Sequence, residues 1–248
     1  MANTAMTQRE RIFNLPPVIV TLGAILILIH VIRLFLPERL DEWVVLAFSF
    51  IPVRYAGAAS ELPGGGWGEI WTPLTYAFLH GGTLHIAVNL VWMASFGSPL
   101  ARRFGAARFL ILSAVAALAG ALAHYLTFPQ GIDPVVGASA AISGMMSATA
   151  RFAFAAGGPL FRIGSDESYR YPAPSFRAML VNRQAMTFLI IWLVLNILFG
   201  TQLGLVPGSD QPVAWQAHIG GFIAGLLLFP LLDPIRRGEP PAEDALAP

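Results

Sequence analysis

The sequence predicts an all-α polytopic membrane protein whose fold is a bundle of six membrane-spanning helices. Of its 248 residues, 56% are hydrophobic and only 12% are charged, whereas a soluble domain carries about 25% charged residues. Six apolar stretches have about the 20 residues that a helix needs to cross a bilayer. They cover residues 17–36, 84–100, 106–127, 138–156, 185–204 and 214–232. Too few polar residues remain to cover a soluble surface, so we expect the lipid bilayer to surround the bundle.

The six stretches differ in character along the chain. The first follows a polar segment, residues 1–16, and is too long for the apolar part of a signal peptide, so we expect it to be retained. The second and fourth hold Ser, Asn, His or Gly, which favours a position inside the bundle. The whole bundle would occupy residues 17–233, and the Gly-, Glu- and Pro-rich tail 234–248 is predicted to be disordered.

Two of the connections between these stretches are long. Residues 37–83 form a loop with an amphipathic stretch, Trp43 to Val53, which we expect to lie on the outer membrane surface. Residues 157–184 are rich in Gly, Pro, Ser and Arg. This second loop is predicted to be irregular and cytoplasmic, with possible contacts to anionic lipid headgroups.

Arginine placement predicts the orientation in the membrane. With the N-terminus in the cytoplasm, the outer side receives only Arg39 and Arg54, with Arg33 at the end of the first span. The remaining arginines fall on the cytoplasmic side: Arg9, Arg11, Arg102, Arg103, Arg108, Arg151, Arg162, Arg170, Arg177, Arg183, Arg236 and Arg237. The positive-inside rule then places both termini in the cytoplasm. A compact six-span chain is typical of a bacterial inner membrane.

Composition and spacing narrow the chemistry. The absence of cysteine excludes disulfides and thiolate chemistry, and a formal net charge of +1 gives no reason to expect a nucleic-acid partner. His30 and His124 have no companion at a metal-ligand spacing such as H-E-x-x-H, so we expect neither a metal nor a cofactor. The aspartates that lie near the spans sit in loops or at helix ends, which argues against aspartate catalysis inside the membrane: Asp133, Asp210 and Asp233.

Polar groups inside membrane helices are costly and therefore indicate function. The first cluster is His80, His85 and Asn89 at the start of the second span. His85 and Asn89 are four residues apart and share a helix face, about 6 Å apart along the axis. Both could donate hydrogen bonds into one small volume. The alternative is that they only bond neighbouring helices and hold the bundle together.

The second cluster, Gly137 to Gly144, begins the fourth span and contains Ser139. Free N–H groups and the helix dipole favour negative charge at a helix N-terminus, which suits an oxyanion. The alternative is an N-cap serine beside a packing face, because Ala140, Gly144 and Ala148 recur every four residues.

The third cluster lies near the outer end of the sixth span. His218, Gly221 and Gly225 share one helix face, and the glycines would let another backbone approach closely. Alone, His218 could simply be bonded to a carbonyl. By the alternating topology, however, Ser139, His85 and His218 fall at a similar depth. A hydroxyl, a base and extra donors are the groups that acyl transfer needs.

These motifs resemble those of the rhomboid family of intramembrane serine proteases, from about Gly68 to Asp233. The family run H-x4-H-x3-N matches His80, His85 and Asn89, and its G-x-S matches Gly137 and Ser139. The run A-H-x-x-G-x-x-x-G matches Ala217 to Gly225. The resemblance implies a six-helix rhomboid-like fold with a water-accessible cavity on the outer side.

The resemblance also implies roles for these residues. Ser139 would be the nucleophile and His218 the general base of a Ser-His dyad without an acidic third member. His85, Asn89 and the backbone N–H of Ser139 would form the oxyanion hole, and His80 would organise the loop. Ser143 stands where many members carry an aromatic that packs on the base. The substrates would be transmembrane segments of other proteins, cut near small residues.

Two departures from the family pattern stand out. Ala140 follows the serine where many members have glycine, and Trp71-Thr72 replaces a frequent Trp-Arg, which we expect to weaken the anchoring of the outer loop. Two alternatives are a catalytically inactive rhomboid-like protein that binds and regulates membrane clients, and a small transporter or channel. Inactive relatives typically lack the serine or the histidine. A transporter would need broken helices or a charge at mid-membrane, for which Arg33 is the nearest candidate.

Overall fold

The structure is a computed structural model that describes residues 15–161, 166–200 and 214–235. The predicted N-terminal segment and tail, residues 1–16 and 234–248, lie almost wholly outside this part. The described residues are mainly helical, and they contain a single isolated β-bridge, between Phe50 and Val135.

All six predicted membrane stretches are helical over most of the length that is described. The helices are α1 (Pro17–Leu34), α4 (Thr83–Trp92) with the π-helical turn η5 (Met93–Gly97), α5 (Ser98–Thr127), α6 (Ser139–Ala153), α8 (Arg183–Gly200) and α9 (Trp215–Leu232). By length and composition, three apolar helical segments among the described residues could cross a membrane: Pro17–Leu34, Thr83–Thr127 and Trp215–Leu232. Gly105, at φ 73° and ψ 166°, breaks the second of these into two. The predicted all-α polytopic fold is confirmed.

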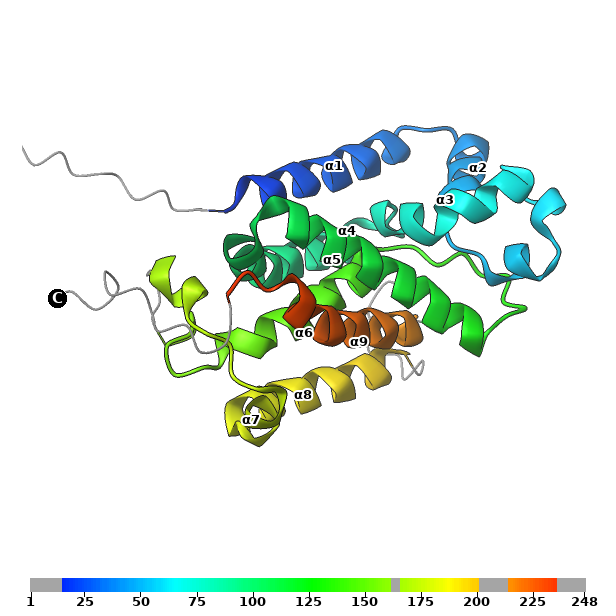
Figure 1. Cartoon of the computed structure of the whole chain (residues 1–248). Coiled ribbons are helices and arrows are strands. Elements are labelled where there is room, and N and C mark those ends of the chain that lie inside the picture. The colour runs from blue at the N-terminus through cyan, green and yellow to red at the C-terminus, as the bar shows by residue number, and fades with distance from the viewer. Residues whose placement is uncertain (1–14, 162–165, 201–213, 236–248) are drawn as a thin grey trace, which may run out of the picture.

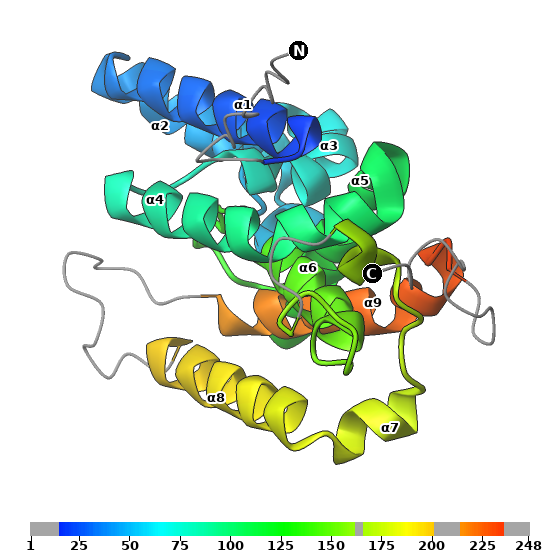
Figure 2. The same cartoon turned by 90° about the vertical axis from the view of Figure 1, so that its left-hand side faces the viewer.

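Helix α6 is the centre of the bundle. It has 15 residues, and each one after Ser139 is buried. Its main partners are α5 and α9, and Figures 1 and 2 show it enclosed by them. A helix buried all round can contain Ser and Thr without facing lipid, so the predicted interior position of the fourth span is correct. The same prediction for α4 is only half right, because α4 buries Ile86 and Asn89 but exposes the apolar Leu84, Val88 and Val91.

Small residues let α5, α6 and α9 touch backbone to backbone. A β-carbon added to Gly221 would overlap the carbonyl oxygen of Ala140, and one added to Gly225 would overlap that of Gly144. On the other side of α6, a β-carbon on Gly144 would lie 2.5 Å from the Ala116 methyl. The packing face predicted from the four-residue repeat is therefore real, and it brings the N-terminal ends of α6 and α9 together.

Both long loops contain helices. The loop at residues 37–83 holds α2 (Glu38–Phe48), α3 (Gly68–Thr75) and the short turns η1 (Pro52–Ala56), η2 (Ala59–Glu61), η3 (Gly65–Trp67) and η4 (Tyr76–Phe78). The loop at residues 157–184, predicted to be irregular, contains η6 (Asp166–Arg170) and α7 (Phe176–Val181). That prediction was wrong for α7, which begins after Ser175, whose hydroxyl accepts a hydrogen bond from the Ala178 N–H and so caps the helix.

Two arginine–aspartate pairs tie the ends of the bundle. Arg33, at the end of α1, forms a bidentate pair with Asp41 of α2, at 2.7 and 3.0 Å. Arg103 forms a second bidentate pair with Asp233, just after α9, at 2.9 and 2.8 Å. Such forked pairs fix geometry as well as charge. Because Arg33 is neutralised at a helix end, it gives no support to a transport pathway.

The loop at residues 37–83 is anchored by hydrogen bonds despite the Thr72 departure. Arg54 is fully buried and donates hydrogen bonds to the carbonyl oxygens of Leu46 (2.9 Å) and Gly65 (3.1 Å). Trp71 Nε1 donates to the Ala47 carbonyl at 2.8 Å, and the hydroxyls of Thr72 and Tyr55 are 2.6 Å apart. Arg54 therefore links α2, which contains Leu46, to the turn at Gly65.

Candidate active site

The backbone just before α6 sets the position of Ser139. Val135 pairs with Phe50 in the β-bridge, and the Gly137 N–H donates to the Tyr76 carbonyl at 3.0 Å. Gly137 adopts φ 125°, a left-handed conformation that favours glycine. The chain turns there, Ala138 takes the N-cap position and Ser139 becomes the first residue of α6. The alternative that Ser139 is itself the N-cap is therefore wrong.

The side chains of Ser139 and His218 meet across the α6–α9 contact. Ser139 Oγ lies 2.7 Å from His218 Nε2, a hydrogen-bonding distance between residues 79 positions apart in the chain. Both residues are only partly buried, so a ligand could approach the hydroxyl. A hydroxyl hydrogen-bonded to an imidazole nitrogen can lose its proton to that nitrogen as it attacks a carbonyl.

His85 lies beside the same point. Its Nδ1 accepts a hydrogen bond from the Gly81 N–H at 3.3 Å, so in the neutral ring Nε2 carries the hydrogen. A β-carbon on Gly137 would lie 2.8 Å from His85 Nε2 and 3.6 Å from Ser139 Oγ. The absence of a side chain at Gly137 therefore leaves the space between the His85 donor and the Ser139 hydroxyl open.

Asn89 and His80 support the site in different ways. Asn89 is buried and its Nδ2 donates to the His85 carbonyl at 2.9 Å, leaving a second amide hydrogen for another acceptor. His80 is buried, its Nε2 lies 3.5 Å from the Ala138 N–H, and its ring meets His85 edge-on with centroids 5.1 Å apart. Burial, with a smaller contribution from the neighbouring His85, lowers the pKa of His80 to about 3. A neutral His80 can accept from the Ala138 N–H and so hold the turn before Ser139.

The remaining predicted site residues lie in the two helices that carry Ser139 and His218. Ser143 Oγ donates to the Ser139 carbonyl at 2.8 Å, within α6. The methyl of Ala140, the departure from the family pattern, is accommodated by Gly120 of α5, whose own β-carbon would lie 2.5 Å from it. Gly221 and Gly225 are the close-packing positions of α9 described above.

The sequence analysis missed one polar residue of this cluster, Asn196 of α8. Its Oδ1 lies 2.6 Å from His218 Nδ1, and its Nδ2 donates to the Trp215 carbonyl at 3.2 Å. The signal was present, because an asparagine within a strongly apolar membrane stretch indicates a specific partner. No second polar residue of the fifth span shares its helix face, so the sequence shows no cluster there.

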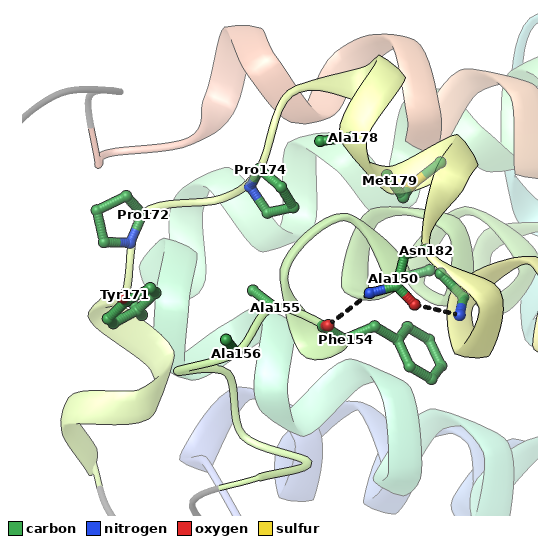
Figure 3. A pocket seen from close by; sticks show the side chains of 11 residues that line it. Ala150, Phe154, Ala155, Ala156, Tyr171, Pro172, Pro174, Ala178, Met179 and Asn182 are labelled. Carbon is green, nitrogen blue, oxygen red and sulfur yellow. Dashed lines mark hydrogen bonds between the residues drawn. The ribbon is translucent and has the colours of Figure 1, made fainter.

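A cavity elsewhere in the molecule does not belong to this cluster. It has a volume of about 400 Å³ and lies where the end of α6 meets the segment leading into α7 (Figure 3). Apolar side chains and prolines dominate its lining, and the Asn182 amide in its wall is engaged with the Phe154 carbonyl at 3.1 Å. Neither Ser139 nor His218 contributes to this lining.

The substitution Gly137→Ala is expected to weaken the site without unfolding the protein. The added methyl would stand 2.8 Å from His85 Nε2, and the left-handed φ of 125° is unfavourable for alanine. We expect a loss on the order of 10²-fold in the rate of labelling of Ser139 by a fluorophosphonate, since misplacements of about 1 Å have such effects. Gly82→Ala is a matched control, because no heavy atom lies within 4 Å of that added carbon. Equal losses in both variants would contradict the assigned role of Gly137.

Fold and site together define a helical multi-pass membrane protein with a serine–histidine pair at one end of its central helix. A rhomboid domain model matches residues 67–234, which covers more than half of the chain and includes every residue of the cluster. The chain therefore belongs to the rhomboid family.

Curated relatives agree with this assignment. The chain is 30% identical over 161 residues to RHOMBOID-like protein 5 of Arabidopsis thaliana and 30% identical over 158 residues to the rhomboid protease GluP of Bacillus subtilis. It is 29% identical over 160 residues to the rhomboid protease GlpG of Serratia proteamaculans. These matches cover 64–65% of the chain but only 43%, 25% and 47% of the relatives' lengths. The chain thus shares their rhomboid part and matches less than half of each relative.

Proposed function

We propose that this chain is an intramembrane serine endopeptidase that cleaves transmembrane segments of other membrane proteins. The observation that carries the proposal is the 2.7 Å hydrogen bond between Ser139 Oγ and His218 Nε2. It lies where the dipole of a central helix favours negative charge. The relatives named as rhomboid proteases support the same class of activity.

The geometry supports a two-step acyl transfer. Ser139 Oγ attacks the scissile carbonyl carbon while its proton passes to His218 Nε2, and the carbonyl oxygen becomes an oxyanion. His218 then gives the proton to the leaving amine as the C–N bond breaks, leaving an acyl group on Ser139. Water, activated by His218, releases the acyl group as a carboxylate and restores the hydroxyl.

The oxyanion would form beside Gly137. Candidate donors are His85 Nε2–H, the free hydrogen of the Asn89 amide and the backbone N–H of Ser139, which belongs to the first turn of a helix. Removing one donor of such a hole typically lowers kcat by about 10²–10³-fold. His80 would act through the turn that it holds.

The expected substrate is a transmembrane helix that unwinds locally. A helical backbone has its carbonyls and N–H groups paired within the segment, so a peptide bond must leave the helix before Ser139 can reach it. Segments with Gly or Pro near the end of their membrane span unwind most easily. Ser139 and His218 lie at the end of the bundle opposite the Arg103–Asp233 pair. We assign the end with Ser139 and His218 to the outer side of a bacterial inner membrane, with both termini cytoplasmic.

The test combines a covalent probe with a substrate. The purified full chain in detergent should be labelled by a fluorophosphonate at Ser139 and should cut a transmembrane model substrate at a bond that mass spectrometry can map. His218→Ala should lower both rates by about 10²–10⁴-fold, since the general base is lost. Labelling or cleavage at the wild-type rate in this variant would contradict the dyad. If the wild type showed neither labelling nor cleavage, that result would favour the inactive, client-binding rhomboid-like alternative.

A further inference from the structure

Asn196 is a buried amide in the apolar part of α8, residues 188–200. It lies in α8, which runs beside α9 at one edge of the bundle (Figure 2). The exposed residues of the same helix include Ile190, Ile191, Leu193, Val194, Leu195 and Ile197, whereas Asn196 is 6% exposed. A polar side chain held inside a membrane bundle needs partners, and both partners of Asn196 are on α9.

The two hydrogen bonds determine which way the amide faces. The Trp215 carbonyl oxygen can only accept, so the Asn196 atom 3.2 Å from it is Nδ2. Oδ1 must then be the atom 2.6 Å from His218 Nδ1. Trp215 and His218 are three residues apart and share one face of α9, which lets a single amide reach both.

The amide orientation in turn determines the tautomer of His218. An amide oxygen is only an acceptor, so Nδ1 carries the hydrogen of the neutral ring. Nε2 is then unprotonated and accepts the Ser139 hydroxyl hydrogen across 2.7 Å. We propose that Asn196 is a positioning residue that holds His218 in the Nδ1–H tautomer and aims its Nε2 at Ser139. This role rests on the proposed function, because it matters for a proton transfer between Ser139 and His218.

An asparagine beside a catalytic histidine can favour the wrong tautomer of the ring, and the hydrogen bond from Asn196 to Trp215 prevents this. In a Ser-His-Asp protease, exchanging the acid for asparagine lowers kcat by about 10⁴-fold because the ring takes the wrong tautomer. Here the Trp215 carbonyl accepts a hydrogen bond from Asn196 Nδ2, so Asn196 Oδ1 faces the His218 ring. Asn196 therefore orients the base without placing a negative charge inside the membrane, where a carboxylate is costly.

Three variants of the full chain in detergent test the role. Asn196→Leu keeps the number and branching of the heavy side-chain atoms but makes no hydrogen bond, and we expect kcat to fall on the order of 10²-fold, with KM within about twofold, because the ring is free to turn. Asn196→Asp keeps an acceptor for Nδ1–H and should recover most of that loss. Trp192→Leu removes the stacking of Trp192 on Phe222, with centroids 4.3 Å apart, and so weakens the α8–α9 contact while keeping both hydrogen-bond partners of the His218 ring. It should lower Tm and leave kcat near the wild-type value.

A second readout is independent of activity. In protein labelled with ¹⁵N-histidine, assigned by a His218→Gln variant, the wild type should show His218 with a protonated Nδ1 and an unprotonated Nε2. Asn196→Leu should give a mixture of tautomers. A wild-type Nε2–H tautomer, or a Leu variant that keeps both wild-type kcat and tautomer, would overturn the inference. Equal kcat losses in the Leu and Trp192 variants would also overturn it. A wild type that fails to cleave would instead count against the proposed function, and the tautomer would still decide the role of Asn196.

Discussion

Replacing Ser139 by alanine is expected to abolish peptide cleavage while leaving the protein folded. The change removes one hydroxyl whose hydrogen bond goes to His218 Nε2, and the Ser139 carbonyl can still accept from Ser143. Removing the nucleophile of a serine protease typically lowers kcat by about 10⁶-fold. We expect no detectable product from a transmembrane substrate, and no labelling by a fluorophosphonate, with Tm within a few degrees of wild type.

The matched control for this prediction is Ser113→Ala in α5. Ser113 Oγ donates to the Phe109 carbonyl one turn earlier at 2.7 Å, so the variant loses a hydroxyl of similar environment away from the cluster. Its cleavage rate should stay within about twofold of wild type. Product that persists in Ser139→Ala at more than about a thousandth of the wild-type rate would exclude Ser139 as the nucleophile.

Sequence reasoning predicted the fold because the membrane imposes a simple length rule. A span needs about 20 apolar residues, and every predicted stretch is helical over most of the length that is described. The depth of the site was predictable for the same reason, since alternating spans place Ser139 and His218 near one end of the bundle. The glycine spacing in α9 indicated close packing, and the overlap at Gly221 shows how close the two backbones are.

The missed features depend on contacts that no spacing reveals. Asn196 is one polar residue in the apolar stretch of residues 188–200. Its partners, Trp215 and His218, are set by how α8 rotates against α9. Arg54 looked like an ordinary loop arginine, yet it is fully buried and bonds two carbonyls distant in the sequence. Helix α7 was missed because glycines, prolines and serines are frequent in the loop around it.

Gly221→Ala is expected to destabilise the protein strongly and to impair the site as well. In a helix without neighbours, the change would stabilise by up to about 1 kcal/mol. Here the added carbon would overlap the Ala140 carbonyl oxygen, a backbone atom that cannot rotate away. Overpacking of this kind costs about 1–3 kcal/mol or more, so the substitution should lower the free energy of unfolding instead of raising it. We expect a drop in Tm in detergent of several degrees, measured by thermal unfolding.

Gly221→Ala should also lower kcat, because Ala140 adjoins Ser139. Relieving the overlap moves α6 away from α9 at the level of Ser139 and His218, which lengthens the distance between Ser139 Oγ and His218 Nε2. Gly225→Ala overlaps the Gly144 carbonyl instead, one turn further from these two side chains, and should lower Tm comparably with a smaller loss of kcat. Gly66→Ala, with no heavy atom within 4 Å of its added carbon, should change neither quantity. A Gly221→Ala variant as stable and active as Gly66→Ala would show that the two helices do not meet as closely as the geometry requires.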